Sequence, residues 1–447
     1  MHCQAGFSKS PRDSDTLQFS NARETYRKFD MKRTVIITLF AAIVGAGVAV
    51  FAYTQIVPFP YDITTRADAF EPENRDWFYQ NASEVFPTRT VRKGDGQPFE
   101  RVEGQLDGFS FEYAGRARTL SDLFTDMETS GLIILHKGKL VYEKYDRGAT
   151  SGTHLATFSL IKSFTSTLVG FAVGENLIKN VEDPLTDYLP ELAGTAYDGV
   201  TIKQALEMSS GVRFDPDGPE NAKDTVQFVT DSVVTGKKPA FDIAVSYPRA
   251  VKPGTVFNYN TAETQILLEL VRRVTGKPAS VYLEEKLWQP LGMVHDAGWV
   301  LDAPGRDGVE IGGAFFNASL LDWAKFGQFI EQNGAWNGEQ LLPPDWVGKA
   351  TRSKEPHLQP GKVHPNPNRG YAWQWWTYPD GTFEATGANG QTLYIDEANN
   401  IVVARSGAWT EGWVKEHDEE TFAFFKALGE WDFSKSTALA QESNLAK

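Results

Sequence analysis

A serine and a lysine stand three residues apart in Ser159-Leu160-Ile161-Lys162, a spacing that suits nucleophilic catalysis. On a helix, residues i and i+3 share a face, so the lysine amine can reach the serine hydroxyl from one rigid element. A serine at a helix N-terminus also places its backbone N–H and the positive end of the helix dipole beside a developing oxyanion. We therefore predict Ser159 as a nucleophile and Lys162 as its proton acceptor.

Lys162 can accept a proton near neutral pH only if its pKa falls well below about 10.4, and burial in the fold can lower it. The alternative interpretation is a surface serine and lysine on a helix. About one such pair is expected by chance in a chain of this composition. The motif needs support from other parts of the chain.

Two later stretches supply groups that acyl transfer would need. PGTVFNYNTAETQILLELVRRVTGK places Tyr259 in a tight turn just before a predicted helix, although a tyrosine can also simply pack a turn. FEATGANGQTLYID predicts a glycine-rich strand edge where backbone N–H groups can approach a substrate, or else only a glycine bulge. The three stretches in this order are more specific than any one of them.

The elements that must position these residues follow from turn signals and periodicity. Strand-like runs flank Lys137-Gly138 and Asn399-Asn400, which predicts two hairpins and hence an antiparallel sheet. Apolar residues at helical spacing predict a buried helix opening near Ser159, another running to a stop at Gly276 and a C-terminal helix. The predicted fold class is α/β (α+β): an antiparallel sheet completed by both ends and flanked by helices, with an inserted helical lobe. Further helix is predicted over 201–211, and 213–225 is predicted to be an irregular loop.

The chain resembles the superfamily of serine β-lactamases, DD-peptidases and esterases, and within its class C-like branch it resembles the 6-aminohexanoate-dimer hydrolases. The resemblance covers roughly residues 130 to 430 and implies a β-lactamase/transpeptidase-like fold. It is carried by FSLIKSFTSTLVG, VEDPLTDYLPELAGTAYDGVTIKQALEMSSGV, PGTVFNYNTAETQILLELVRRVTG, GGAFFNASLLDWAKFGQFI, YAWQWW and GANGQTLYID.

Site roles follow from the resemblance residue by residue. It implies that Ser159 is acylated, that Lys162 is its base and that Tyr259 relays a proton to the leaving group. The backbone N–H groups of Ser159 and Ala388 would form the oxyanion hole. Substrate-binding roles are implied for Thr261, Thr386, Gly387 and Asn389.

Two departures from the superfamily pattern bear on the substrate. Ala385-Thr386-Gly387 stands where β-lactamases and DD-peptidases have Lys-Thr-Gly, so the cation that meets a substrate carboxylate is missing. Thr261 replaces the asparagine that these enzymes usually have two residues after the tyrosine. Both departures point away from penicillins and toward a linear amide or ester. A carboxylesterase and a weak β-lactamase or DD-peptidase share the same residues, and a binding protein acylated without turnover is an alternative of another class.

Composition narrows the partners. A net charge of -14, without a clustered basic surface, predicts no nucleic-acid partner. Cys3 is the single cysteine, and the seven histidines form no zinc-binding pair, so we expect no metal and no other cofactor. The remaining partners are a small amide or ester substrate and a membrane. The oligomeric state stays open.

The apolar run over residues 34–57 is long enough to cross a bilayer, and basic residues precede it. We predict a short cytoplasmic segment (1–33), a transmembrane anchor or signal segment (34–57), a linker and N-terminal wrapping segment (58–119), the hydrolase domain (120–435) and a tail (436–447). The catalytic domain would then be periplasmic and tethered to the inner membrane, with secretion after signal cleavage as the alternative. Met1 and Met31 both remain possible start residues.

Two features stay open. His154 can line the cleft or lie in a surface loop. Aromatic residues of YAWQWW (Tyr371, Trp373, Trp375 and Trp376) can form a wall for an apolar substrate chain or pack in the core.

Overall fold

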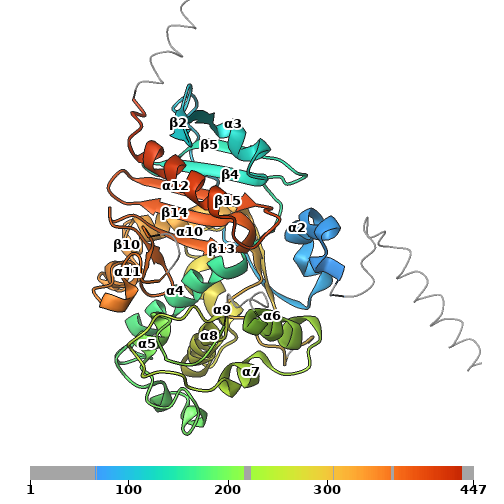
Figure 1. Ribbon diagram of the computed structural model, residues 1–447, viewed down its shortest axis with the longest axis vertical. Helices are drawn as coiled ribbons and strands as arrows, with labels where there is room; N and C mark the ends of the chain where they lie inside the picture. Colours follow the sequence, from blue (N-terminus) through green and yellow to red (C-terminus); the bar gives the residue numbers. More distant parts are fainter. Residues whose placement is uncertain (1–65, 67, 216–222, 306, 364–366, 435–447) are drawn as a thin grey trace, which may run out of the picture. The chain divides into compact units, whose positions relative to one another are not determined.

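The computed structural model describes residues 66, 68–215, 223–305, 307–363 and 367–434, and a seven-stranded antiparallel sheet forms the centre of these residues (Figure 1). The strand order is β11-β12-β13-β14-β15-β4-β5, so two early strands lie beside five late ones. This order confirms that both ends of the domain complete one sheet. The strands are β4 (Thr129–His136), β5 (Lys139–Tyr145), β11 (Gly370–Tyr371), β12 (Trp376–Thr377), β13 (Phe383–Gly387), β14 (Gln391–Asp396) and β15 (Ile401–Gly407).

Both predicted hairpins are present in the sheet. Lys137 and Gly138 connect β4 to β5 with φ values of 51° and 72°, the pair of positive angles that a two-residue turn of type I′ needs. Asn400, with φ of 54°, precedes β15 in the other hairpin. The turn residues therefore set the local pairing of β4 with β5 and of β14 with β15.

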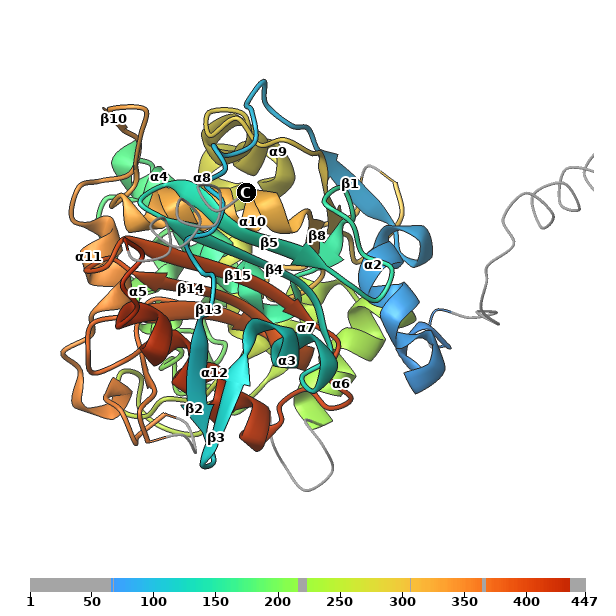
Figure 2. The ribbon, with the colours of Figure 1, turned by 90° about the horizontal axis from the view of Figure 1, so that it is seen from above.

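Helices cover both faces of this sheet (Figure 2). One face packs against α3 (Leu120–Thr125), α12 (Lys415–Gly429) and the hairpin of β2 (Ser110–Tyr113) and β3 (Arg116–Thr119). The other face packs against α10 (Leu320–Glu331). Phe424, Phe425 and Leu428 of α12 are at most 2% exposed, and each such burial stabilises the fold by about 1.5–3 kcal/mol.

The helical lobe follows β5 in the chain and lies beside the sheet, with α4 between the two (Figure 1). This arrangement confirms the predicted inserted lobe. Its helices are α4 (Ile161–Gly174), α5 (Ile202–Leu206), α6 (Lys223–Val229), α7 (Ala240–Ser246), α8 (Thr261–Thr275) and α9 (Ala279–Leu283), with π-helical turns at Thr230–Val234 and Glu284–Trp288. Later in the chain come α11 (Trp346–Thr351) and the short hairpin of β9 (Ala335–Trp336) and β10 (Glu339–Gln340).

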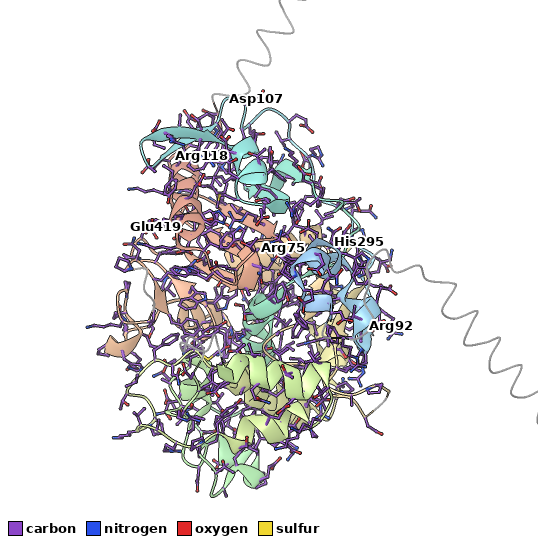
Figure 3. All side chains as sticks on the ribbon, turned by 45° about the vertical axis from the view of Figure 1, so that its right-hand side comes forward. Arg75, Arg92, Asp107, Arg118, His295 and Glu419 are labelled. Atoms are coloured by element: carbon purple, nitrogen blue, oxygen red, sulfur yellow. The ribbon has the colours of Figure 1, made fainter. Side chains whose placement is uncertain are left out.

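The segment predicted as a linker and wrapping segment contains regular elements that join the body of the domain. β1 (Thr88–Val91) begins a second sheet of order β1-β7-β8-β6, and α2 (Arg75–Val85) precedes it. Arg92 pairs with Glu284 at 2.6 Å, and Arg118 pairs with Glu420 at 2.6 Å (both arginines are labelled in Figure 3). The other strands of this sheet are β6 (Leu155–Ala156), β7 (Ala297–Val300) and β8 (Phe316–Ala318).

The predicted anchor or signal segment (34–57) lies outside the described residues, as do the segment 1–33 and the tail 436–447. None of the helices in the described part of the chain combines the length and the apolar character that crossing a membrane requires. The membrane segment and the periplasmic location therefore stay predictions from the sequence.

Candidate active site

Ser159 and Lys162 lie in contact at the N-terminus of α4. Ser159 belongs to a single 3-10 turn, η3 (Phe158–Leu160), and Lys162 follows in the first turn of α4. Lys162 Nζ donates a hydrogen bond to Ser159 Oγ at 2.9 Å. Ser159 is half-buried, whereas Lys162 is only 2% exposed. The predicted pair therefore shares one side of a rigid element, as the three-residue spacing requires.

The amine of Lys162 is buried among neutral acceptors. Besides Ser159 Oγ, its Nζ donates to the carbonyl oxygen of Gly313 at 2.7 Å and to Thr261 Oγ1 at 3.3 Å. Within the described residues no carboxylate forms an ion pair with it. Burial therefore disfavours the ammonium and lowers the pKa of Lys162 from 10.5 to about 7. A lysine with this pKa can exchange a proton with a serine hydroxyl near neutral pH.

Lys162→Met is expected to stabilise the fold at pH 7 by roughly 2–4 kcal/mol, since each pKa unit of difference corresponds to roughly 1.4 kcal/mol. The unfolded lysine stays protonated up to about pH 10.4, while the folded one loses its proton above about pH 7. The penalty of burying the ammonium is therefore full below pH 7 and fades as the pH rises toward 10. Denaturant unfolding of both proteins at pH 7 and pH 9.5 measures this; an equal difference at both pH values would contradict it.

The turn that carries Ser159 is held in an unusual backbone conformation. Phe158 has a φ of 45°, which is uncommon for a bulky residue and is found mostly where surrounding structure enforces it. Its ring packs edge-on against Tyr79 of α2 at 4.9 Å and against Phe315 at 6.1 Å between centroids. Packing of α2 and of the segment before β8 therefore supports the turn from behind.

Tyr259 joins the pair from the start of α8. Its ring faces the buried amine, with Lys162 Nζ 4.9 Å from the ring centroid. The next residue, Asn260, caps α8, because its side chain accepts from the N–H of Glu263 at 3.2 Å. The cap fixes where the helix begins and hence where Tyr259 stands. The structure thus brings together all three residues predicted as catalytic.

Trp376 supports the ring of Tyr259. The two rings stack with centroids 5.7 Å apart and planes at 22°. The guanidinium of Arg369 lies 5.6 Å from the Trp376 ring, and Arg369 itself is paired with Glu384 and, at 2.8 Å, with Asp418. These three charged side chains are buried. A buried ion network therefore backs the aromatic pair that positions Tyr259.

The end of β13 passes directly beside the turn of Ser159. A Cβ at Gly387 would lie 2.2 Å from the carbonyl oxygen of Thr157 and 3.1 Å from Cβ of Phe158, so no larger residue fits there without movement. Ala388 follows at the start of η9 (Ala388–Gly390). This approach places the chain bearing the predicted oxyanion N–H of Ala388 next to η3. Its role in holding an oxyanion stays a prediction.

The remaining predicted substrate-binding residues differ in their surroundings. Thr261 is 3% exposed and accepts from Lys162, so its hydroxyl contacts the base. Asn389 has φ of 64° and donates its side-chain amide to the carbonyl of Trp409 at 2.8 Å, which stabilises the turn after β13. Thr386 is half-buried near the end of β13, and Ala385 before it is 1% exposed. Contacts of these residues with a substrate stay predictions.

Gly313 is a part of the site to which we assigned no role from sequence. Its carbonyl accepts from Lys162, and a Cβ there would lie 2.8 Å from Cγ2 of Thr261 and 3.3 Å from Lys162 Nζ. The signal available in the sequence was the pair Gly312-Gly313 in GGAFFN. Adjacent glycines indicate a close approach of backbone, but they do not say to what.

Gly313→Ala is expected to lower kcat/KM for Ser159-dependent turnover by roughly 10- to 100-fold. The added methyl group does not fit beside Thr261 and Lys162, so it overpacks this space and displaces the lysine amine. The measurements are kcat/KM at a pH high enough for it to reach its limiting value, and the thermal unfolding temperature. Gly348→Ala is the matched control, since the nearest atom to its Cβ is 3.9 Å away. Equal effects of the two substitutions on kcat/KM would refute the steric argument.

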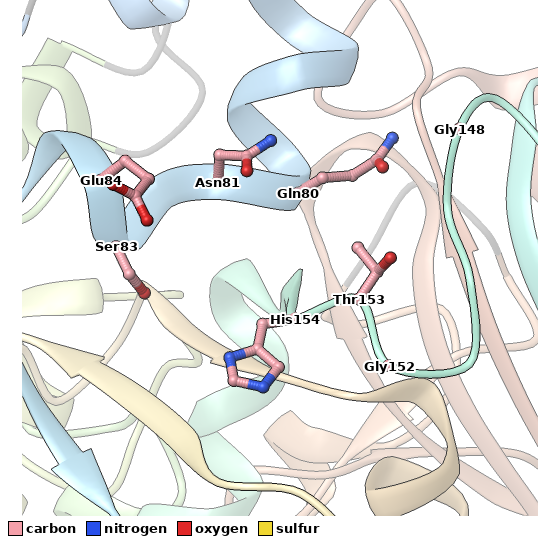
Figure 4. A pocket seen from close by; sticks show the side chains of 8 residues that line it. All are labelled: Gln80, Asn81, Ser83, Glu84, Gly148, Gly152, Thr153 and His154. Carbon is pink, nitrogen blue, oxygen red and sulfur yellow. The ribbon is translucent and has the colours of Figure 1, made fainter. Parts of the chain in front are cut away.

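His154 lines a hollow of about 470 Å³ formed by α2 and the loop before β6 (Figure 4). Burial, and then the neighbouring His295, lower the pKa of His154 below its ordinary value, which disfavours the charged imidazolium. Ser159, Lys162 and Tyr259 are not among the residues that line this hollow, so the predicted catalytic residues do not form it. The hollow is lined by Gln80, Asn81, Ser83, Glu84, Gly148, Gly152, Thr153 and His154.

The aromatic residues of YAWQWW lie mainly in the core, since none is more than 9% exposed. Trp373 packs against Trp346 with centroids 5.1 Å apart, and Trp375 against Phe383 at 5.5 Å. Core packing therefore explains these two tryptophans.

In the described ranges, no three His, Cys, Asp or Glu side chains are grouped as metal ligands.

The sheet, the inserted helical lobe and the serine-lysine pair at their junction define a class of protein: the serine hydrolases of β-lactamase/transpeptidase-like fold. A family model described as Beta-lactamase matches residues 117–415. The chain belongs to the beta-lactamase family.

Known proteins of related sequence and structure support this assignment. The 6-aminohexanoate-dimer hydrolase of Paenarthrobacter ureafaciens is 28% identical over 350 residues, covering 76% of this chain and 86% of that protein. A Bacillus anthracis structure assigned as a 6-aminohexanoate-dimer hydrolase superposes with a TM-score of 0.73 at 26% identity, covering 82% of this chain and 96% of that one. A family VIII carboxylesterase shares the fold, with a TM-score of 0.54 at 18% identity over 69% of this chain and 95% of that one.

Proposed function

We propose that this serine hydrolase cleaves linear amides or esters through an acyl-enzyme on Ser159. The observation that carries the proposal is the buried amine of Lys162, with a pKa of about 7 and its Nζ 2.9 Å from Ser159 Oγ. At pH 7 roughly half of such amines are neutral and ready to take the serine proton, against less than about 0.1% for an ordinary lysine.

The reaction proceeds in two acyl-transfer steps. Lys162 takes the proton of Ser159 as Oγ bonds to the substrate carbonyl carbon, and the backbone N–H groups of Ser159 and Ala388 receive the oxyanion. The bond to the leaving amine or alcohol then breaks as the proton passes from Lys162 through Tyr259 to the leaving atom. Water then attacks the acyl carbon and loses its proton to the relay, which runs in reverse and protonates Ser159 Oγ as the bond between Oγ and the acyl carbon breaks. This step releases the acid and frees Ser159.

The choice of a linear substrate rests on the residue that stands where β-lactamases and DD-peptidases have the lysine of Lys-Thr-Gly. Ala385 is apolar and buried where a lysine would bind the carboxylate of a penicillin, so this position offers no ion pair. Two relatives, at 28% and 26% identity, carry the name 6-aminohexanoate-dimer hydrolase, and a dimer of 6-aminohexanoate joined by one amide bond is a linear amide. These observations support a linear amide first and a simple ester second.

The test offers the purified protein three substrates: the linear 6-aminohexanoate dimer, a p-nitrophenyl acyl ester and a chromogenic cephalosporin. Initial rates, and intact-protein mass spectra of quenched samples, report turnover and the acyl adduct separately. We expect turnover of the dimer or the ester, with the adduct mapping to the peptide of Ser159. Turnover of the cephalosporin alone would favour a β-lactamase, and an adduct without turnover would favour a binding protein.

A further inference from the structure

The acceptors around Lys162 determine where its lone pair points. A neutral amine has two N–H bonds and one lone pair. Gly313 O and Thr261 Oγ1 take two donor directions of Nζ, so the third direction, toward Ser159 Oγ, is left for the lone pair. Thr261 is fixed by the start of α8, but Gly313 lies in a chain segment outside both helices. What holds the carbonyl of Gly313 therefore controls the direction in which Lys162 accepts a proton.

The backbone beside Gly313 is held by a buried glutamine. Gln265 accepts from the N–H of Gly312 at 2.8 Å through Oε1 and donates to the carbonyl of Glu310 at 3.0 Å through Nε2. Its side chain is fully buried, so both bonds form without competition from solvent. One side-chain amide thus pairs with the segment 310–312 much as a neighbouring strand would.

A second contact comes from α4. Thr165 donates from Oγ1 to the carbonyl of Gly312 at 3.0 Å and is also fully buried. Thr165 lies three residues after Lys162 on α4, and Gln265 lies four residues after Thr261 on α8. Helix α4 carries Lys162 and helix α8 carries its acceptor Thr261. The same two helices therefore also hold the segment that carries the other acceptor, Gly313.

We infer that Gln265 is a positioning residue of this enzyme: it holds the segment 310–312 so that the carbonyl of Gly313 takes an N–H of Lys162 and the amine lone pair faces Ser159. Thr165 assists it through Gly312. The inference rests on the proposed function, because it assigns Lys162 the role of base. The hydrogen bonds of the Gln265 side chain in the described structure go to the backbone of Glu310 and Gly312, so we expect its effect to pass through the backbone of residues 310–313.

The first experiment substitutes Gln265→Met, which keeps the side-chain length and removes both hydrogen bonds. We expect the limiting kcat/KM per folded molecule to fall roughly 10- to 100-fold, as for other losses of positioning. In a plot of kcat/KM against pH, the rise on the acidic side (the acidic limb) should move to lower pH. The reason is that a displaced Gly313 carbonyl no longer stabilises the ammonium form of Lys162. Gln328→Met on α10 is the matched control, since Gln328 is buried but bonds to Glu331.

Thr165→Val gives a milder test that keeps the fold if Gln265→Met does not. It should change kcat/KM and the acidic limb in the same direction, by roughly 2- to 10-fold in rate. Thr167→Val is its control, because Thr167 is equally buried on α4 and donates to Ser163 instead. Loss of stability in the Gln265 and Thr165 variants with an unmoved limb and unchanged kcat/KM would overturn the inference.

A direct titration separates this inference from the proposed function. NMR of the full chain labelled at the lysine ε-carbon follows protonation of Lys162 without any turnover, and Lys162→Met assigns its signal. We expect the Lys162 signal in Gln265→Met to titrate at a pH lower by roughly one unit, a tenfold change in proton affinity. Absence of Ser159-dependent turnover in wild type would contradict the proposed function. A Lys162 titration that is the same in Gln265→Met and wild type would overturn the role of Gln265, whether or not turnover is seen.

Discussion

Ser159→Ala is expected to lower kcat/KM for a p-nitrophenyl acyl ester by roughly 10³- to 10⁶-fold, the range found when a nucleophile is removed from a catalytic set. Ser159 Oγ lies 2.9 Å from Nζ of Lys162, whose pKa is lowered to about 7 by burial, and Ser159 itself is half-buried. The variant should also lose the acyl adduct. The measurement is the steady-state rate of both proteins, with the adduct followed by intact mass.

The matched control for this prediction is Ser166→Ala. Ser166 lies on α4, the helix that follows the turn of Ser159, is fully buried, and its Oγ has no hydrogen-bond partner in the described structure. Its loss therefore tests the effect of a serine-to-alanine change on α4 itself. Equal turnover by Ser159→Ala and wild type would remove Ser159 as the nucleophile, and turnover equally low in both would move the binding-protein alternative ahead.

Lys162→Met is expected to lower kcat/KM roughly 10²- to 10⁴-fold, the contribution usually made by a general base. In wild type, kcat/KM should rise with pH and reach half its limiting value near pH 7, because the neutral amine is the active form and burial lowers the lysine pKa to about 7. The variant should lose this acidic limb. A pH profile from 5 to 9 with the ester measures both effects.

Lys325→Met is the control for removal of a buried lysine. Lys325 lies on α10, is 5% exposed, and burial lowers its pKa as well, but it faces the rings of Phe99 and Trp336. Its replacement should leave the pH profile unchanged. An acidic limb that persists near pH 7 in Lys162→Met would show that another group titrates and that Lys162 is not the base.

Local sequence rules predicted the elements of the site well. The positive φ of Lys137 and Gly138 follows from a two-residue turn, and Gly276 ends α8 with a φ of 66°. The three-residue spacing of Ser159 and Lys162 already required a shared helix face. These features involve residues close in the chain, so the relevant geometry is that of a single turn or helix.

Segments without periodicity offer fewer signals for prediction. Residues 58–119 read as a linker and wrapping segment, because β1, β2 and β3 have only four residues each and show no long alternation. The partner of β1 is β7, whose register pairs Val91 with Ala297. β1 forms because a distant strand, β7, accepts it, and that strand is not visible in the local sequence. β2 and β3 pair with each other.

By itself, the sequence singled out the three residues predicted to carry the chemistry. Ser159, Lys162 and Tyr259 were predicted from spacing, turn signals and family resemblance, and the structure brings them together. Only the tertiary structure decided the state of Lys162. Its pKa and the direction of its lone pair depend on burial and on acceptors at Thr261 and Gly313, which lie 99 and 151 residues along the chain. Proton affinity is set by the whole surroundings of a group, and those surroundings exist only after the sheet and the helical lobe have packed together.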